Sequence, residues 1–281
     1  SLEDGNMIYV AEMTINHLGS TNVLKAMITA AKDSGANMVK FKFKDVDAYY
    51  PDDGKMWRNM NFKAYRRSLE INRGDVQEIV DHCKAVGIDW FSTVHDQASL
   101  DFVSGFGPAA LKIASMDAAK SDLFDLVVKA CGDMDIPMVY SMGGKSHEFF
   151  KSALKKIEEA GIEAHILHCV SLYPTPDGLS NCRYVRRMLG EVSASSRVSI
   201  GYSGHEVGYA ASIIAALSGA TMIERHFSLS RDFKIHHLEC ALLPREYREM
   251  IDSVSKVLKE DSRDSATSSG ESRFLDDLDY G

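Results

Sequence analysis

The chain has 281 residues, 45% of them hydrophobic, and a formal net charge of -8 at pH 7. A protein with this negative balance is poorly suited to bind nucleic acid or an anionic membrane surface, and we expect neither as a partner. No apolar run approaches the roughly 20 residues that span a bilayer, and residues 1–6 lack the basic start of a signal peptide.

Eight β-type runs follow one another along the chain, with segments of helical periodicity between them. The runs are Ile8–Glu12, Met38–Lys42, Asp89–Thr93, Ala110–Ser115, Pro137–Ser141, Ala164–Val170, Val198–Tyr202 and Thr221–His226. The helical segments include Val23–Ser34, Asp75–Val86, Ala98–Ser104, Leu123–Ala130, Glu148–Ala160, Tyr184–Val192, Gly208–Leu217 and Arg245–Leu258. Several of these helices end at a glycine just before the next strand, and Asp75 is predicted to be an N-cap.

Alternation of strands and helices predicts parallel pairing with right-handed crossovers. Eight such units in about 250 residues are the size of a (β/α)8 TIM barrel, which we assign to residues 1–260. A doubly wound open sheet is the alternative, but it would usually carry a GxGxxG turn after the first strand, and residues 12–17 do not read so.

Two further segments stand outside this alternation. Asp45–Arg73 interrupts the second unit, and we expect either a lid over the mouth of the barrel or a solvated excursion. Residues 261–281 are rich in serine and aspartate, which predicts a flexible tail.

The five cysteines are scattered, odd in number and never in a CxxC pattern. This usage predicts free thiols in a reducing cytosol, and therefore a cytoplasmic location. The cysteines are Cys83, Cys131, Cys169, Cys182 and Cys240.

Histidines and a glutamate close the last two strands. Glu224 and His226 are two apart on one strand and therefore share a face, and His205 follows the neighbouring run. If the two runs pair, these groups form a candidate divalent metal site. The alternative is a surface histidine and a core histidine with local hydrogen bonds.

Lysines also stand inside strands. Lys40 and Lys42 share a face of the second run, and Lys112 lies within the fourth. Because a buried unpaired charge costs several kcal/mol, these lysines, with hydroxyl groups at neighbouring strand ends, predict a pocket for a phosphate plus a carboxylate. The alternative is that Lys40 and Lys112 extend outward between the helices.

Taken together, these residues resemble the N-acetylneuraminate (sialic acid) synthase family. The matching stretches, in family order over about residues 7–260, are AEMTINHLGS, SGANMVKFK, WFSTVHD, LKIASMD, YSMGG, HCVSLYPTP, SGHEVGYAA and ATMIERHFSL. The resemblance covers the barrel domain only, and we expect the chain to lack the antifreeze-protein-like domain that follows the barrel in typical members.

The resemblance implies a metal-dependent condensation of phosphoenolpyruvate with an N-acetylated amino sugar, such as N-acetylmannosamine. The product would be a nonulosonic acid such as N-acetylneuraminate, with release of phosphate. The implied metal is Mn2+, with Mg2+ or Co2+ as alternatives, held by His205 and His226. Glu12, Glu224 and Lys112 are the implied catalytic residues. The implied substrate-binding residues are Lys40, Lys42, Thr93, Ser115, Asp117, Ser141, Ser171 and Tyr173.

Several positions depart from the family pattern. The family's K-F-Q reads K-F-K, so Lys42 replaces a glutamine, and G-S-x-E becomes Ala114-Ser115-Met116-Asp117. An asparagine becomes Ser171, S-D-H becomes Ser203-Gly204-His205, and G-P-D reads Ile235-His236-His237, which makes His237 a candidate third metal ligand.

These departures put the identity of the sugar in question. Two other readings stay open: a barrel aldolase or lyase that acts on another 2-keto sugar acid, and a non-catalytic relative that binds a sugar acid. We expect small-molecule partners and, by analogy with the family, a homodimer.

Overall fold

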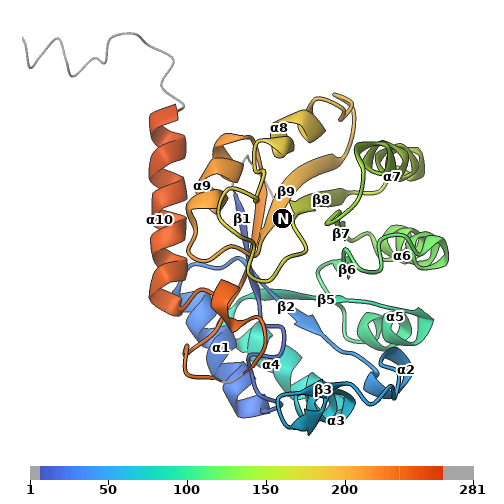
Figure 1. Ribbon diagram of the computed structural model, residues 1–281. Helices are drawn as coiled ribbons and strands as arrows, with labels where there is room; N and C mark the ends of the chain where they lie inside the picture. Colours follow the sequence, from blue (N-terminus) through green and yellow to red (C-terminus); the bar gives the residue numbers. More distant parts are fainter. Residues whose placement is uncertain (1–6, 234, 262–281) are drawn as a thin grey trace, which may run out of the picture.

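The computed structural model describes residues 7–233 and 235–261 (Figure 1). These residues form a closed barrel in which every neighbouring strand pair is parallel. In barrel order the strands are β1 (Ile8–Glu12), β10 (Met222–His226), β9 (Val198–Gly204), β8 (Ala164–Cys169), β7 (Met138–Ser141), β6 (Leu111–Ile113), β5 (Asp89–Thr93) and β2 (Met38–Lys42). The (β/α)8 prediction is confirmed, and the open-sheet alternative is wrong.

Helices surround the strands on the outside (Figure 1). They are α1 (Thr21–Asp33), α4 (Val76–Val86), α5 (Gln97–Ser104), α6 (Ser121–Met134), α7 (His147–Ala160), α8 (Tyr184–Leu189), α9 (Ala210–Leu217) and α10 (Pro244–Asp261). Gly87 and Gly161 end α4 and α7 in the left-handed conformation, as the glycine signal predicted.

Some element boundaries differ from prediction, for local reasons. The run Ala110–Ser115 is a strand only over Leu111–Ile113, because the chain turns at Ala114, whose carbonyl accepts from the Asp117 N–H. Pro137 has no N–H to donate to a ladder, and β7 begins one residue later. Asp75 does stand at the N-cap position of α4, but its side chain accepts from the Thr21 hydroxyl at 3.1 Å instead of capping the helix.

Two apolar clusters support the barrel. The larger packs the outer faces of the strands against the helices. The smaller fills the inside of the barrel toward the amino ends of its strands, and consists of Ile8, Val10, Met38, Phe91, Ala110, Val139, Leu167 and Met222. Strand alternation explains the division, since every second side chain of a strand points inward.

The segment between β2 and α4 forms α2 (Val46–Tyr49), a hairpin of β3 (Met56–Trp57) and β4 (Met60–Asn61), α3 (Phe62–Ser68) and the 3-10 turn η1 (Arg73–Asp75). Tyr65 and Leu69 from this insertion pack on Ile235 and Leu238 in the connection that follows β10. The insertion is therefore docked on the carboxyl side of the barrel through α3, as the lid interpretation requires, whereas residues 51–60 are exposed apart from the half-buried Trp57.

All five cysteines are buried and unbridged, so the prediction of free thiols is confirmed. No helix in the described ranges is long and apolar enough to cross a membrane. The predicted tail falls almost wholly on residues 262–281, which lie outside the described residues; Asp261 is the last residue of α10.

Candidate active site

Five charged side chains from four strands meet inside the barrel at the carboxyl ends. Both Glu224 carboxylate oxygens lie 2.6 Å from the Lys112 ammonium, and one of them lies 3.0 Å from Lys40 Nζ. Lys40 also pairs with Glu12, and Lys42 Nζ lies 3.6 Å from the other oxygen of Glu12. The result is one ionic cluster that joins β1, β2, β6 and β10.

The burial of this cluster decides between the two interpretations of the strand lysines. Lys40 and Lys112 are each only 2% exposed and point into the barrel. The alternative of lysines that extend outward between the helices is therefore wrong. Glu12 and Glu224, which supply the opposite charges, are as deeply buried.

The pKa values in the cluster shift as burial and pairing require. Burial raises the pKa of Glu224, but the charges of Lys112 and Lys40 outweigh it and hold that pKa well below its ordinary value. Burial, with the neighbouring ammonium groups, depresses the pKa of Lys40 and lowers that of Lys42 to about 8. Glu224 is therefore a carboxylate at neutral pH, and Lys42 is a cation that is close to releasing its proton.

Hydroxyl groups line the barrel beside the charges. Ser203 donates to Glu224 Oε1 at 3.1 Å. The buried hydroxyls of Thr93 and Ser141 have no hydrogen-bond partner within residues 7–233 and 235–261. Buried polar groups in proteins are normally paired, and these two are free to meet a ligand.

Gly143, in the turn after β7, closes the serine side of the site. Its N–H donates to Ser115 Oγ at 2.8 Å, and Ser115 Oγ lies 3.0 Å from Cys169 Sγ. A Cβ placed on Gly143 would lie 2.2 Å from Ser171 Oγ and 2.9 Å from Cys169 Sγ. A side chain at this position would have to displace the two serine hydroxyls and the thiol, so glycine lets the backbone approach them.

Two histidines stand beside the cluster, at the ends of β9 and β10. The ring centroids of His205 and His226 are 5.5 Å apart, and two imidazoles that share one ion lie with centroids about 5 Å apart. His205 Nδ1–H donates to the Val170 carbonyl at 2.7 Å, which leaves Nε2 as its free lone pair. His226 Nδ1 is buried without a partner among the described residues.

Both rings are in the protonation state that metal binding needs. Burial lowers the pKa of His205 to about 3 and depresses that of His226 strongly, so both are neutral near pH 7. Neutral imidazoles, one of them oriented by a backbone carbonyl, have the donor chemistry of metal ligands. The pair fits a divalent metal ion.

His237 is placed differently from this pair. The Tyr173 ring lies between His205 and His237, with centroids 4.1 and 4.4 Å away. Within residues 7–233 and 235–261, no group of three His, Cys, Asp or Glu side chains is arranged to hold a metal ion. The third ligand therefore stays a prediction.

Asp117 lies at the β5–β6 side of the mouth, where it has partners that the sequence did not indicate. It accepts from His95 Nδ1 at 2.7 Å and pairs with Lys120 at 2.7 Å. Burial raises the pKa of Asp117, but these partners hold it below its ordinary value. His95 follows Thr93 by two residues, a spacing that could have indicated it.

The insertion contributes Arg66, which the sequence did not indicate. Arg66 donates to His236 at 3.3 Å and pairs with Glu70 at 3.3 Å. Its position inside an unassigned loop carried no signal in the sequence. It ties the insertion to the connection that holds His237.

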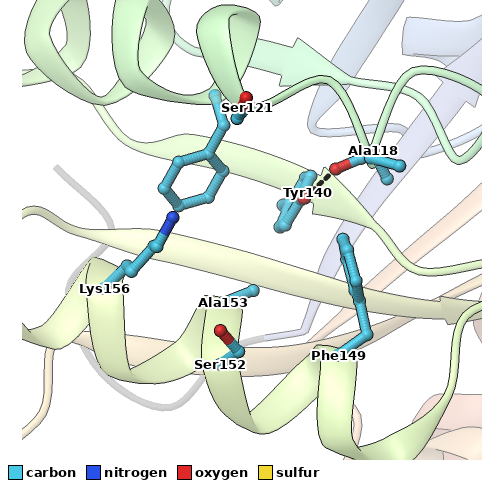
Figure 2. A pocket seen from close by; sticks show the side chains of 9 residues that line it. Ala118, Ser121, Tyr140, Phe149, Ser152, Ala153 and Lys156 are labelled. Carbon is cyan, nitrogen blue, oxygen red and sulfur yellow. Dashed lines mark hydrogen bonds between the residues drawn. The ribbon is translucent and has the colours of Figure 1, made fainter.

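Two cavities lie near β7. One, of about 670 Å3, is lined by Cys169 and Ser171 of the site and by Lys145, His168 and Arg187, among others. The other, of about 90 Å3, lies between α6 and α7 and holds none of the predicted site residues (Figure 2). Its Tyr140 hydroxyl is satisfied by the Ala118 carbonyl at 2.5 Å. Only the larger cavity borders the candidate active site.

Comparison with known proteins is consistent with this geometry. The NeuB family matches residues 27–265. N-acetylneuraminate-9-phosphate synthase of Drosophila melanogaster is 29% identical over 255 residues, an alignment that covers 88% of this chain and 66% of that protein. Pseudaminic acid synthase of Campylobacter jejuni is 27% identical, in an alignment that covers 90% of this chain and 74% of that protein. The chain thus spans about two thirds to three quarters of the length of these relatives.

Solved structures share the same fold. The spore coat polysaccharide biosynthesis protein SpsE of Bacillus subtilis superposes with a TM-score of 0.77 at 28% identity, over 96% of this chain and 73% of that one. Sialic acid synthetase of Leptospira borgpetersenii superposes with a TM-score of 0.83 at 22% identity, over 97% and 91%. The latter likeness supports the barrel fold alone.

Proposed function

The chain belongs to the NeuB family, and on this premise we propose that it condenses phosphoenolpyruvate with an N-acetylated amino sugar to give a nonulosonic acid and phosphate. The observation that carries the proposal is the buried cluster of Lys40, Lys112 and Glu224 at the carboxyl ends of the strands. Functional groups of TIM-barrel enzymes lie at this face.

The charge balance of the cluster suits an anionic substrate. When all five groups are ionised, three lysines face two glutamates, Glu12 and Glu224. The excess positive charge and the unpaired hydroxyls of Thr93 and Ser141 would hold the carboxylate and phosphate of phosphoenolpyruvate. Ser115 and Ser171, on either side of Gly143, would complete that pocket.

His205 and His226 would hold the metal, for which we propose Mn2+, with Mg2+ or Co2+ as alternatives. When bound, such an ion polarises the sugar aldehyde as a Lewis acid. Glu12 would orient the open-chain sugar; its Oε1 accepts from the Thr14 N–H at 2.7 Å. Glu224 would keep Lys40 and Lys112 in place, and Tyr173 would cover the histidine pair.

The acceptor sugar is set by the mouth of the barrel. Relatives carry the names of different acids, N-acetylneuraminate 9-phosphate and pseudaminic acid among them. Here Lys42 and Asp117 give the mouth charged groups of both signs, and His95, whose pKa burial lowers to about 4, adds a neutral imidazole beside Asp117. We propose N-acetylmannosamine or a related N-acetylated amino sugar as the acceptor class.

Phosphate release from phosphoenolpyruvate tests the proposal. The assay includes Mn2+, a panel of N-acetylmannosamine, its phosphorylated form and bacillosamine-type sugars, and chelator and His226→Ala as controls. Release that depends on one sugar and is abolished by both controls is the expected result. If the protein instead releases pyruvate from a 2-keto sugar acid in the absence of phosphoenolpyruvate, the result would support an aldolase or lyase. Binding of a sugar acid without turnover would support a non-catalytic relative.

A further inference from the structure

Arg225 stands between Glu224 and His226 on β10 and is completely buried. Because it alternates with those inward residues, its side chain lies on the outer face of the barrel wall. The mechanism above gives it no role. A buried guanidinium is costly unless it is paired and hydrogen-bonded. Nε of Arg225 has no partner among the described residues, so the partners of its two terminal nitrogens indicate what it does.

The guanidinium of Arg225 joins three segments of the chain. One nitrogen donates to Glu206 Oε1 at 2.7 Å and to Ser212 Oγ at 3.0 Å. The other donates to the backbone carbonyls of Glu206 at 2.8 Å and Cys240 at 3.3 Å. Glu206 and Cys240 lie close in sequence to histidines of the candidate site, whereas Ser212 belongs to α9 (Ala210–Leu217), which contains no histidine.

Arg225 and two of its partners lie close to the site histidines along the chain. Arg225 immediately precedes His226, and Glu206 immediately follows His205. The Cys240 carbonyl belongs to η2 (Leu238–Cys240), and the Cys240 thiol contacts the His237 carbonyl at 3.1 Å. One buried side chain therefore fixes the backbone beside His205 and His226, and the turn after His237.

Glu206 is equally committed to this arrangement. Its second oxygen accepts from the Tyr202 hydroxyl at 2.8 Å, and Ser212 Oγ lies 3.3 Å from the first. Glu206 is 6% exposed. A buried carboxylate with this set of donors is an oriented partner for Arg225 and not a surface charge.

Gly204 leaves room for the Glu206 carboxylate beside Arg225. A Cβ on Gly204 would lie 2.6 Å from Glu206 Oε2, 2.7 Å from Tyr202 Cε1 and 3.0 Å from Arg225 Cδ. The space beside Arg225 admits the Glu206 carboxylate only because position 204 has no side chain.

We propose that Glu206 and Arg225 are positioning residues that hold His205 and His226 at the spacing of a metal site. The inference rests on the proposed function, since it concerns the metal of that site.

Mn2+ affinity without substrates tests the inference, measured as free Mn2+ by electron paramagnetic resonance at a temperature where each variant is folded by circular dichroism. Glu206→Gln should weaken Mn2+ binding about 10–100-fold, the usual cost of losing an outer partner of a ligand. Glu163→Gln, which removes the acid of the surface pair with Arg197, should bind as the wild type does.

A rescue experiment separates positioning from general damage. Gly204→Asp should weaken binding in the wild type, where it collides with Glu206, and should restore part of the affinity in a Glu206→Ala background. If neither Glu206 variant folds, Arg225→Lys carries the test, because it keeps the charge but loses the second nitrogen, and should weaken Mn2+ binding.

The possible failures are distinct. A wild-type protein that binds no Mn2+ would overturn the metal-dependent function and this inference with it. If the wild type binds Mn2+ and the folded variants Glu206→Gln and Arg225→Lys bind it equally tightly, this inference alone would be overturned.

Discussion

The inside of the barrel has two halves, built by the same strands and equally buried. Toward the amino ends the inward side chains are apolar, as in Val10, Leu167 and Met222. Two residues further along the same strands stand Glu12, Cys169 and Glu224. Burial alone therefore does not distinguish the two halves. The lower half, toward the amino ends, is apolar and stabilises the fold, whereas the upper half, toward the carboxyl ends, holds the charged groups of the candidate site.

The largest expected effect comes from replacing charged residues of the upper half by apolar ones, like those of the lower half. The double variant Lys112→Met/Glu224→Leu removes a buried ion pair and leaves Lys40 with Glu12. Replacing such a pair by apolar groups is often neutral or stabilising by about 1–4 kcal/mol. We expect thermal unfolding at or above the wild-type temperature, and phosphate release at background.

The single variant Glu224→Leu is the control for that experiment. It leaves Lys112 buried without its partner, and should lower the free energy of unfolding by about 3–5 kcal/mol. A double variant that turned over substrate, or that was less stable than the single one, would contradict the division of the barrel into two halves.

The lower half should respond in the opposite way. Leu167→Ala removes a fully buried side chain and should lower the free energy of unfolding by about 2–5 kcal/mol in urea titrations. The kcat of the folded fraction should stay at the wild-type value. Leu179→Ala, at an exposed position, should change stability by less than about 0.5 kcal/mol. Loss of kcat in Leu167→Ala would show that the apolar layer also shapes the site.

A smaller effect should distinguish Lys42 from the fully buried lysines. Its pKa lies at about 8 because of burial, so its positive charge is present below pH 8 and is lost as the pH rises through 8. The KM for phosphoenolpyruvate should therefore rise above pH 8, by up to about fivefold for one partly exposed charge. Lys42→Gln should have, at every pH, the KM that the wild type reaches only above pH 8, and therefore no step near pH 8. A step that survived in Lys42→Gln would belong to another group.

The smallest effect is expected outside the barrel, in the crevice between α6 and α7 (Figure 2). Lys156 lies 5.6 Å from the centre of the Phe124 ring there, an interaction near the surface. Lys156→Ala should leave kcat and KM unchanged and alter the free energy of unfolding by less than about 0.5 kcal/mol. A change in KM would mean that this crevice takes part in binding.

The sequence predicted the parts of the molecule that depend on local patterns. The bounds of β1, β2 and β5 match the predicted runs, because alternation and turn residues define a strand within a few positions. The lysines inside strands indicated a charged interior, since such residues are too costly to bury without purpose.

What the sequence could not supply was pairing over long separations. Lys112 and Glu224 are 112 residues apart, and Lys40 and Glu224 are 184 apart. Which ammonium meets which carboxylate depends on the closure of the barrel, not on spacing. The same holds for the contacts of His95 with Asp117 and of Arg66 with His236. Of these four residues, the sequence assigns only Asp117 to the site.

The complete burial of the five thiols has a practical consequence for spectroscopy. Burial raises the pKa of Cys83, Cys131 and Cys240 to about 12, so thiol-reactive dyes should leave the wild-type chain unlabelled. Met56 on the β3 hairpin is 58% exposed, and a Met56→Cys variant would offer one reactive sulfur. A single fluorophore at that position would report directly on how the docked insertion responds when substrates enter the barrel.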